Sequence, residues 1–369
     1  MNAAIVHEWL NNYGGSERLL SEILEVVPSA SLYALIHNDK NLKGTPLEQI
    51  EVVTSLLQKV PRVESLYRWL LPLMPFAVER LNLHPHDLII SISHAVAHGI
   101  KKDASQLHIS YVCTPMRYAW HLREDYLRLH RLDKPGLSII ARLVLDLLRR
   151  WDAAASSRAD RLLSISEWTR ELIRRAWRRE STVIYPPVEV ERFNPARDRD
   201  NFYMTVSRFV PYKMVAEIIR AFNHLRLPLI VVGDGPEYER LLRSAGPNVQ
   251  LVGYQNDSIV TDLMNRAKGF VYMAVEDFGI AMAEAQAAGC PVIAHARGGA
   301  TEIVREGETG YLFSEQTPAS MIEAVLRLEQ GPLNNKAARK NAIRFSSERF
   351  RREFTSYLDA AVTSFRSSA

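Results

Sequence analysis

Short apolar runs alternate with amphipathic stretches along most of the chain. Apolar runs of strand length lie at 3–6, 107–112, 202–206, 229–232 and 249–252, and stretches with helical periodicity lie at 137–155, 167–179 and 319–328. Buried strands that alternate with helices are typical of α/β proteins with parallel sheets. The first run leads through His7-Glu8-Trp9 and a glycine turn into a helix, which is how a Rossmann-like unit begins. The pattern therefore predicts an α/β fold with Rossmann-like lobes.

A proline-rich break divides this pattern near its middle. Tyr185-Pro186-Pro187-Val188 and Phe193-Asn194-Pro195 interrupt strand and helix alike. A chain of 369 residues is long enough for two domains of ordinary size. We therefore predict a first lobe at 1–186 and a second at 187–346, with a hinge near 186–200 and a last amphipathic helix at 347–369.

Composition and cysteine usage predict a soluble, cytoplasmic protein. Hydrophobic residues make up 47% and charged residues 24%, as in globular proteins. Cys113 and Cys290 form neither a CxxC pair nor a disulfide framework, which favours a reducing compartment. The N-terminus lacks the pattern of a signal peptide, and the most apolar window, 69–78, is too short to cross a bilayer.

Positive charge is concentrated in the first lobe. Residues 117–180 contain fifteen Lys and Arg against nine Asp and Glu, although the whole chain is only +4. Such a stretch suits nucleic acid or an anionic membrane surface. No nucleic-acid module accompanies it, so peripheral contact with the inner membrane face is the better of the two, and solvated arginine faces are equally compatible. The apolar, proline-broken segment 61–82 fits either core packing or an acceptor-lipid contact.

The residues between 275 and 312 carry the clearest candidate chemistry. Glu276 and Glu284 have seven residues between them, and Phe278-Gly279-Ile280 forms a turn into a helix. The first N–H groups of a helix lack partners inside it and can bind an anion. Carboxylates for hydroxyl groups and amides for phosphate together suit a sugar nucleotide.

The order of motifs in this region resembles the donor site of retaining glycosyltransferases of family 4. The shared features are E-D-F-G, the second glutamate, A-x-G-x-P-V-I-A, G-G, E-I-V and G-x-T-G-Y-L-F. That family has the GT-B fold, in which two Rossmann-like lobes face a central cleft and the last helix returns to the first lobe. The resemblance implies that Glu276 binds sugar hydroxyls and that Glu284 binds the ribose. It also implies that Arg208 and Lys213 of an S-R-x-x-x-x-K motif hold the diphosphate, and that the remaining donor contacts are Gly233, Gly253, Tyr254, Phe278, Gly279 and Ile280.

In the first lobe, the run from Cys113 to Trp120 resembles the family motif H-T-P-M-R-Y-x-W. The family histidine is taken to lie beside the transferred sugar, and Cys113 replaces it here. A thiol hydrogen-bonds weakly and carries no positive charge, so His94 or His121 must supply that function or it is lost. We take Glu276, Cys113 and His94 as the candidate catalytic residues, and Arg117 with the Gly14-Gly15 turn as acceptor-side residues. A purely conformational role for that turn is equally compatible.

No metal or cofactor is expected. His94 and His98 are spaced i, i+4, but no third ligand is placed to help, and Asp198-Arg199-Asp200 lies in the linker. The resemblance implies transfer of a hexose, mannose from GDP-mannose, with retention, to a glycan or lipid-linked acceptor in surface-polysaccharide assembly. Three alternatives stay open: a sugar-nucleotide-binding protein without transferase activity, an epimerase, and an oxidoreductase, which the missing GxGxxG disfavours. The residues do not decide the sugar, the base, the acceptor, the linkage or the oligomeric state.

Overall fold

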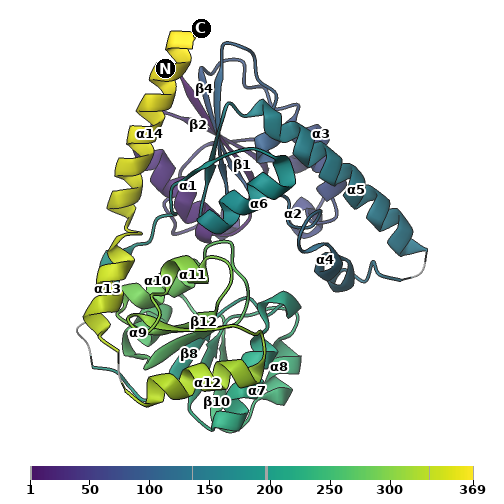
Figure 1. The fold of residues 1–369 in the computed structure, drawn as a ribbon. Coiled ribbons are helices and arrows are strands. Elements are labelled where there is room, and N and C mark those ends of the chain that lie inside the picture. Colours follow the sequence, from purple (N-terminus) through teal and green to yellow (C-terminus); the bar gives the residue numbers. More distant parts are fainter. Residues whose placement is uncertain (1, 135, 196–197, 332, 369) are drawn as a thin grey trace. The chain divides into compact units, whose positions relative to one another are not determined.

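The chain divides into two compact units in the computed structural model, which describes residues 2–134, 136–195, 198–331 and 333–368 (Figure 1). Unit 1 comprises residues 1–187 and 348–369, and unit 2 comprises residues 188–347. The break after residue 187 lies one residue from the boundary that the Pro186-Pro187 pair predicts.

Unit 1 is built on a seven-stranded sheet in which all neighbouring strands are parallel. The strand order is β3-β2-β1-β4-β5-β6-β7, so the order reverses between β1 and β4. The strands are β1 (Ala3–Leu10), β2 (Ser31–His37), β3 (Val52–Thr54), β4 (Leu88–Ser93), β5 (Leu107–Val112), β6 (Arg161–Ser164) and β7 (Thr182–Val183).

The first strand is longer than the apolar run at 3–6 predicts. β1 continues to Leu10, where it is still paired with β2, so His7, Glu8 and Trp9 lie on the strand and not after it. His7 and Glu8 are fully buried. Polar residues were expected to end the strand, and that expectation is wrong because the surrounding unit supplies partners for them.

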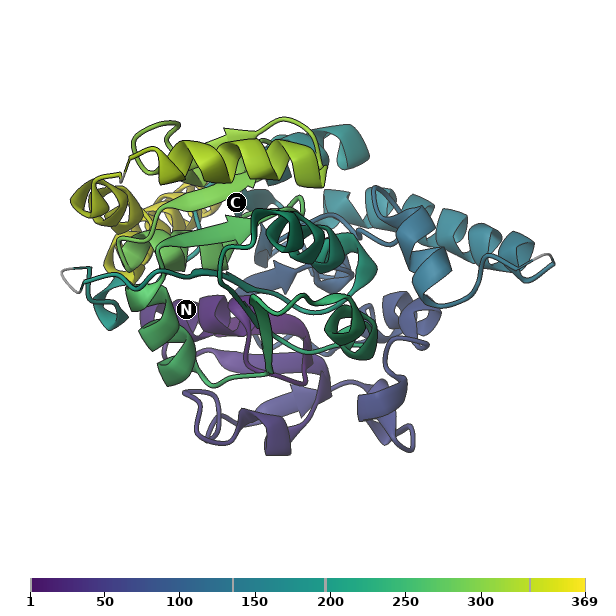
Figure 2. The same cartoon turned by 90° about the horizontal axis from the view of Figure 1, so that it is seen from below.

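Helices cover both faces of the unit 1 sheet. They are α1 (Gly15–Val26), α2 (Val63–Leu66), α3 (Met74–Val78), α4 (Arg123–Leu129), α5 (Leu137–Ala155), α6 (Glu167–Trp177) and α14 (Ser347–Ser368), with 3-10 turns η1 (Asp39–Leu42), η2 (Leu56–Lys59), η3 (Leu71–Leu73), η4 (Ala97–Gly99) and η5 (Ser156–Arg158). The long helix α5 has the bounds that its periodicity predicts, and it extends away from the sheet with α4 at its side (Figures 1 and 2). Among the described helices, none has the length and apolarity that crossing a bilayer requires.

The last helix, α14, packs on unit 1. Its Phe350 and Phe354 are fully buried and contact the ring of Tyr111 on β5, with centroids 6.1 and 6.5 Å away. Arg351 also pairs with Glu22 of α1. These contacts close one face of the sheet with the C-terminal end of the chain.

Unit 2 repeats the same design with six parallel strands. Their order is β10-β9-β8-β11-β12-β13, which again reverses once, between β8 and β11. The strands are β8 (Tyr203–Val206), β9 (Leu229–Val232), β10 (Val249–Gly253), β11 (Gly269–Tyr272), β12 (Val292–His295) and β13 (Gly310–Phe313). The helices are α7 (Val215–Leu225), α8 (Tyr238–Ser244), α9 (Asp257–Arg266), α10 (Ile280–Ala287), α11 (Ala300–Ile303), α12 (Pro318–Glu329) and α13 (Asn335–Ile343), with 3-10 turns η6 (Val190–Arg192) and η7 (Pro211–Lys213).

Replacing Phe354 by alanine should destabilise unit 1 by about 3–5 kcal/mol, because it removes a fully buried ring and leaves a cavity. The six tryptophans, at 9, 69, 120, 151, 168 and 177, all lie in unit 1, so tryptophan fluorescence during urea unfolding reports on this unit. Thr355→Ala, one residue along on the exposed side of α14, serves as the control. Equal unfolding midpoints for the two variants would show that α14 does not stabilise the unit.

Candidate functional site

In unit 2, the reversal of strand order brings the loop after β8 next to the loop after β11. In open α/β sheets, ligands bind outside the carboxyl ends of the strands at such a switch point. Lys213 follows β8, and Glu276 follows β11. Their side chains form an ion pair, and the hydroxyl of Tyr272 also donates to Glu276 Oε1. Two predicted donor-site residues therefore meet at the switch point, together with a tyrosine that the sequence analysis missed.

This cluster is largely shielded from solvent. The side chains of Lys213 and Glu276 are 16% and 18% exposed, and Tyr272 is buried. Burial lowers the pKa of the Lys213 ammonium, but the charge and hydrogen bond of Glu276 together with the neighbouring tyrosines outweigh it, so the net pKa lies above its usual value. Burial and Glu276 both raise the pKa of Tyr272. At neutral pH the site holds a cation, a carboxylate and a neutral phenol.

Close packing of backbone holds the Glu276 loop in place. The N–H of Gly299 donates to the carbonyl of Glu276 at 2.9 Å. A Cβ atom on Gly299 would lie 1.9 Å from the carbonyl oxygen of Phe278, so no larger residue fits. The G-G pair of the motif therefore acts by allowing close approach of two loops.

The turn before α10 has the backbone geometry that its glycine suggests. Gly279 has φ +101°, in the left-handed region that favours glycine, and Ile280 is the first residue of the helix. The carbonyl of Gly279 accepts from Met282 N–H at 2.9 Å, which starts the helical hydrogen bonding. Phe278 is buried beneath the turn and packs against Phe345. The predicted anion-binding turn, Phe278-Gly279-Ile280, is thus a helix N-terminus at the carboxyl side of β11.

Glu284 has a partner that the sequence analysis did not identify. Its Oε1 atom accepts from Arg192 Nη2 at 2.7 Å, and both side chains are mostly buried. Arg192 also lies 3.3 Å from Asp257 and stacks on the ring of Phe193. Because Arg192 lies in η6, ninety-two residues before Glu284, no local pattern could reveal the pair. Glu284 and Glu276 therefore have different ionic partners.

The glycine turns after β9 and β10 are joined to the loop after β8. Gly233 N–H donates to the carbonyl of Gly253 at 2.9 Å, and a Cβ atom on Gly233 would lie 1.8 Å from the Ser207 carbonyl oxygen. Arg208, in the loop that starts at Ser207, is exposed, and the ring of Tyr254 is 79% exposed. Gly233, Gly253, Tyr254 and Arg208 therefore share the edge of the sheet that carries Lys213.

In unit 1, the corresponding switch point between β1 and β4 holds a buried carboxylate. Glu8, on β1, accepts backbone N–H bonds from the turn after β4, that is from His94, Ala95, Val96 and Ala97, at 2.8–3.0 Å to Oε1. The Nδ1 atom of His94 lies 2.7 Å from Oε2. Burial raises the pKa of Glu8, but His94 and the backbone donors lower it more, so its pKa lies well below the usual range. The sequence analysis placed His94 at this strand end and missed Glu8.

His94 and Cys113 follow neighbouring strands. Ser93 of β4 is the register partner of Val112 of β5, and the Cys113 N–H donates to the Ser93 carbonyl at 2.7 Å. Cys113 is half-buried, whereas His121, the other histidine considered as a substitute, is exposed. His94 therefore follows the strand that neighbours the strand before Cys113, whereas His121 does not follow a neighbouring strand.

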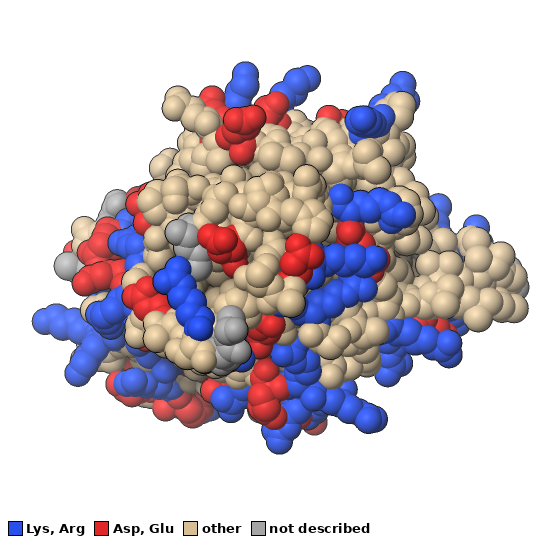
Figure 3. Space-filling view, turned by 90° about the horizontal axis from the view of Figure 1, so that it is seen from above, with Lys and Arg blue, Asp and Glu red and all other residues tan. Residues whose placement is uncertain are grey.

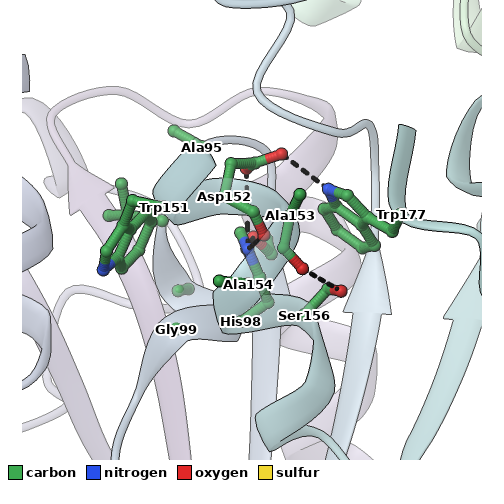
Figure 4. A network of polar contacts seen from close by, with 12 residues as sticks. Ala95, His98, Gly99, Trp151, Asp152, Ala153, Ala154, Ser156 and Trp177 are labelled. Carbon is green, nitrogen blue, oxygen red and sulfur yellow. Dashed lines mark hydrogen bonds and ion pairs between the residues drawn. The ribbon is translucent and has the colours of Figure 1, made fainter. Parts of the chain in front are cut away.

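A buried polar network supports the segment from Cys113 to Trp120. Asp152 of α5 is fully buried, and its Oδ2 atom accepts from the indole N–H of Trp177 at 2.6 Å (Figure 4). The same oxygen accepts from the indole N–H of Trp120 at 2.8 Å. The ring nitrogens of His98 lie 3.0 Å from Ser93 Oγ and 3.2 Å from the Asp152 carbonyl oxygen. Burial raises the pKa of Asp152. Trp120 ends the segment that carries Arg117, which is half-buried, so this network anchors that segment to α5 and α6.

His94 and His98 do not converge, because His94 faces Glu8 and His98 faces Asp152. Within the described residues, no three His, Cys, Asp or Glu side chains form a group that could hold a metal ion.

Gly14 precedes α1, where its N–H donates to Glu17 Oε2 at 2.9 Å. Its φ of −127° is open to any residue, but a Cβ atom there would lie 3.3 Å from both Asn12 Nδ2 and Glu17 Oε2. Gly15, the first residue of α1, is exposed.

Replacing Glu8 by glutamine should destabilise unit 1 at pH 7 by about 2 kcal/mol, because the amide N–H₂ group in place of Oε2 cannot accept from the His94 N–H and the uncharged side chain binds the backbone donors at Oε1 more weakly. The folded-state pKa of Glu8 is depressed, so its stabilising contribution is complete above the unfolded value of about 4.3 and is lost as the pH falls below it. Urea unfolding followed by tryptophan fluorescence should therefore show a wild-type advantage at pH 7 that shrinks towards pH 3. Glu25→Gln, on the exposed side of α1, is the matched control, and a pH-independent difference would contradict this role.

Comparison with known proteins finds similar glycosyltransferases. Residues 188–345 match the family model for glycosyl transferases group 1. An uncharacterized glycosyltransferase of Methanocaldococcus jannaschii is 28% identical over 191 residues, 50% of this chain and 53% of that protein. A GDP-mannose-dependent alpha-(1-6)-phosphatidylinositol monomannoside mannosyltransferase of Mycolicibacterium smegmatis is 31% identical over 41% of this chain and 48% of that protein. A D-inositol 3-phosphate glycosyltransferase of Mycobacterium marinum is 29% identical over 50% and 44%, so the matches span about half of each relative.

The whole chain also resembles solved structures. The crystal structure of Anabaena HepE in complex with UDP and glucose superposes with a TM-score of 0.71, at 18% identity, over 97% of this chain and 99% of that one. This likeness and the two parallel sheets confirm the predicted fold class, an α/β protein of GT-B type with two Rossmann-like lobes. The match to the group 1 family model covers nearly all of unit 2.

Proposed function

We propose that the protein is a retaining glycosyltransferase that moves mannose from GDP-mannose to a hydroxyl group of a lipid-linked or oligosaccharide acceptor. Unit 2 binds the donor, and unit 1 binds the acceptor. The observation that carries the proposal is the Lys213–Glu276–Tyr272 cluster at the switch point of the unit that matches the group 1 family model.

The cluster and the turn beside it match the parts of a nucleotide sugar. The Lys213 ammonium, the exposed guanidinium of Arg208 and the N-terminus of α10 supply positive charge for a diphosphate without requiring a metal ion. Glu276 is held by two donors, Lys213 and Tyr272, so its carboxylate is oriented in advance for sugar hydroxyls. Glu284, oriented by Arg192, accepts from the ribose hydroxyls.

In the proposed reaction, the bond between the anomeric carbon and the leaving phosphate oxygen breaks while the acceptor oxygen bonds to the same face of that carbon. The acceptor proton passes to the departing diphosphate, so charge and atoms balance. Lys213, Arg208 and the amides at Gly279 and Ile280 stabilise the negative charge that develops on the leaving group. In unit 1, His94 follows the strand next to the one that Cys113 follows, and it is the histidine to test for the function that Cys113 lacks.

The choice of donor rests on the relatives. The mycobacterial mannosyltransferase is GDP-mannose-dependent by name, and the motifs from Cys113 to Trp120 and from Glu276 to Ile280 resemble those of mannosyltransferases. Another relative is named as a D-inositol 3-phosphate glycosyltransferase, and HepE was crystallised with UDP and glucose. GDP-mannose is therefore the first donor to test, and uridine nucleotides are its closest competitors.

A second candidate function is sugar-nucleotide binding without transfer. It is favoured by one departure from the family motif, because Cys113 stands at the end of β5 where mannosyltransferases of this kind have histidine. A thiol there gives no cation beside the donor.

GDP-mannose should raise the thermal melting temperature of the protein, whereas GDP-fucose, UDP-glucose, UDP-N-acetylglucosamine and NAD should have smaller effects or none. Glu284→Ala should abolish the shift, and Arg192→Met should weaken donor affinity by about tenfold, because the remaining carboxylate loses its orienting partner. A chelator should leave the shift and donor hydrolysis unchanged.

Arg220→Met is the matched control for Arg192→Met, because Arg220 pairs with a glutamate on the surface of α7. A rise in melting temperature with a UDP-sugar but not with GDP-mannose would identify that UDP-sugar as the donor in place of GDP-mannose. If no sugar nucleotide changed the melting temperature, both hypotheses, a transferase and a sugar-nucleotide-binding protein, would be wrong. Formation of a new sugar nucleotide without an acceptor would indicate an epimerase.

Cys113→His should raise donor hydrolysis if the protein is a transferase weakened at this position, because the variant restores the imidazole of the family motif at the end of β5. The measurement is release of nucleoside diphosphate, with Cys290→Ser as the control for loss of a thiol. Donor binding without hydrolysis in the wild type and in this variant would favour the non-catalytic binding protein.

A further inference from the structure

One face of α5 is apolar and exposed, although the opposite face already packs into unit 1. Leu145, Leu148 and Asp152 are buried on the inner side. Ile139, Ile140, Leu143 and Leu147 are 63%, 62%, 60% and 64% exposed. At 100° per residue these four positions fall within one arc on the other side of the helix. We call them the outer apolar strip.

The strip is not an ordinary scatter of surface residues. Single exposed apolar side chains are common, but a contiguous set of large ones marks an interaction surface. Its members are aliphatic, they follow one another along two turns of the same helix, and α5 extends away from the sheet of unit 1 (Figures 1 and 2). Unit 1 therefore presents them to an outside partner.

Cations border the strip, while the acidic residues of α5 are engaged elsewhere. Arg150 lies on α5 and Lys134 precedes it, while Arg149 stacks on the ring of Trp120 and Arg142 pairs with Glu124 of α4 at 2.6 Å. The two acids of the helix are Asp146, which pairs with Arg123 at 2.8 Å, and Asp152, which is buried. Figure 3 shows an uncharged surface on the side to which α5 extends, with Lys and Arg next to it.

We infer that the outer apolar strip docks unit 1 on an anionic lipid bilayer. A helix that lies in the interface buries its apolar face at the headgroup boundary, while flanking Lys and Arg contact anionic lipids. Cations beside the strip favour an anionic lipid surface over a second copy of the chain, which carries the same positive charges. The inference concerns α5 alone and does not depend on the proposed donor or reaction.

The test is sedimentation of the full chain with vesicles of phosphatidylcholine alone and of phosphatidylcholine mixed with phosphatidylglycerol. The wild type should bind the mixed vesicles, and binding should fall as salt is raised, because screening weakens the contribution of the arginines. The double variant Ile140→Gln/Leu143→Gln should lose about tenfold or more of this binding. Leu242→Gln/Ile259→Gln, which changes two exposed apolar residues of unit 2, is the matched control and should bind as the wild type does.

Absence of wild-type binding, or equal binding by Ile140→Gln/Leu143→Gln, would overturn the inference. Light scattering that shows a dimer in the wild type and a monomer in this variant, without vesicle binding, would assign the strip to a second copy. Circular dichroism and the thermal shift with GDP-mannose should be unchanged in the variant, since none of the substituted residues belongs to the donor site. A protein that binds vesicles but no sugar nucleotide would retain this inference and lose the proposed function.

Discussion

The single reversal of strand order in each sheet determines where the polar chemistry of this protein gathers. Parallel strands direct their following loops to one edge, and the loops on the two sides of a reversal diverge towards opposite faces of the sheet. In unit 2 this geometry brings Lys213, from the loop after β8, to Glu276, from the loop after β11. In unit 1 it brings the turn after β4 to Glu8 on β1. In both units, the reversal of strand order therefore brings a charged side chain to its partner: a lysine to Glu276 in unit 2, and backbone N–H groups to Glu8 in unit 1.

The three buried or mostly buried carboxylates Glu8, Asp152 and Glu284 accept hydrogen bonds from groups in distant parts of the chain. Glu8 is held by backbone N–H groups and His94, Asp152 by two indoles, and Glu284 by Arg192. A buried carboxylate without such donors would be strongly destabilising. The network around Glu8 and the network around Asp152 are linked in unit 1, because Ser93 Oγ lies within hydrogen-bond distance of both Glu8 and His98.

The arrangement explains why motif residues of unit 2 were easier to identify than their supporting residues. Glu276, Gly279 and Glu284 lie within nine positions of one another, and their spacing is fixed by one turn and one helix. Tyr272 is equally close in sequence, but a tyrosine at the end of an apolar strand gives no signal of its own. Arg192 lies in a linker and Glu8 beside His7 in a mostly apolar strand, so no local pattern indicates the partner of either residue.

The sequence alone determined the succession of strands and helices, the break near Pro186, the extent of α5 and the donor motif, because these depend on local periodicity and short spacings. Only the tertiary structure decided that β1 runs on to Leu10, that Glu276 pairs with Lys213 and Glu284 with Arg192, and that one apolar face of α5 is left uncovered. Periodicity shows that a helix has an apolar face, but whether a neighbour covers that face depends on contacts between segments far apart in the chain.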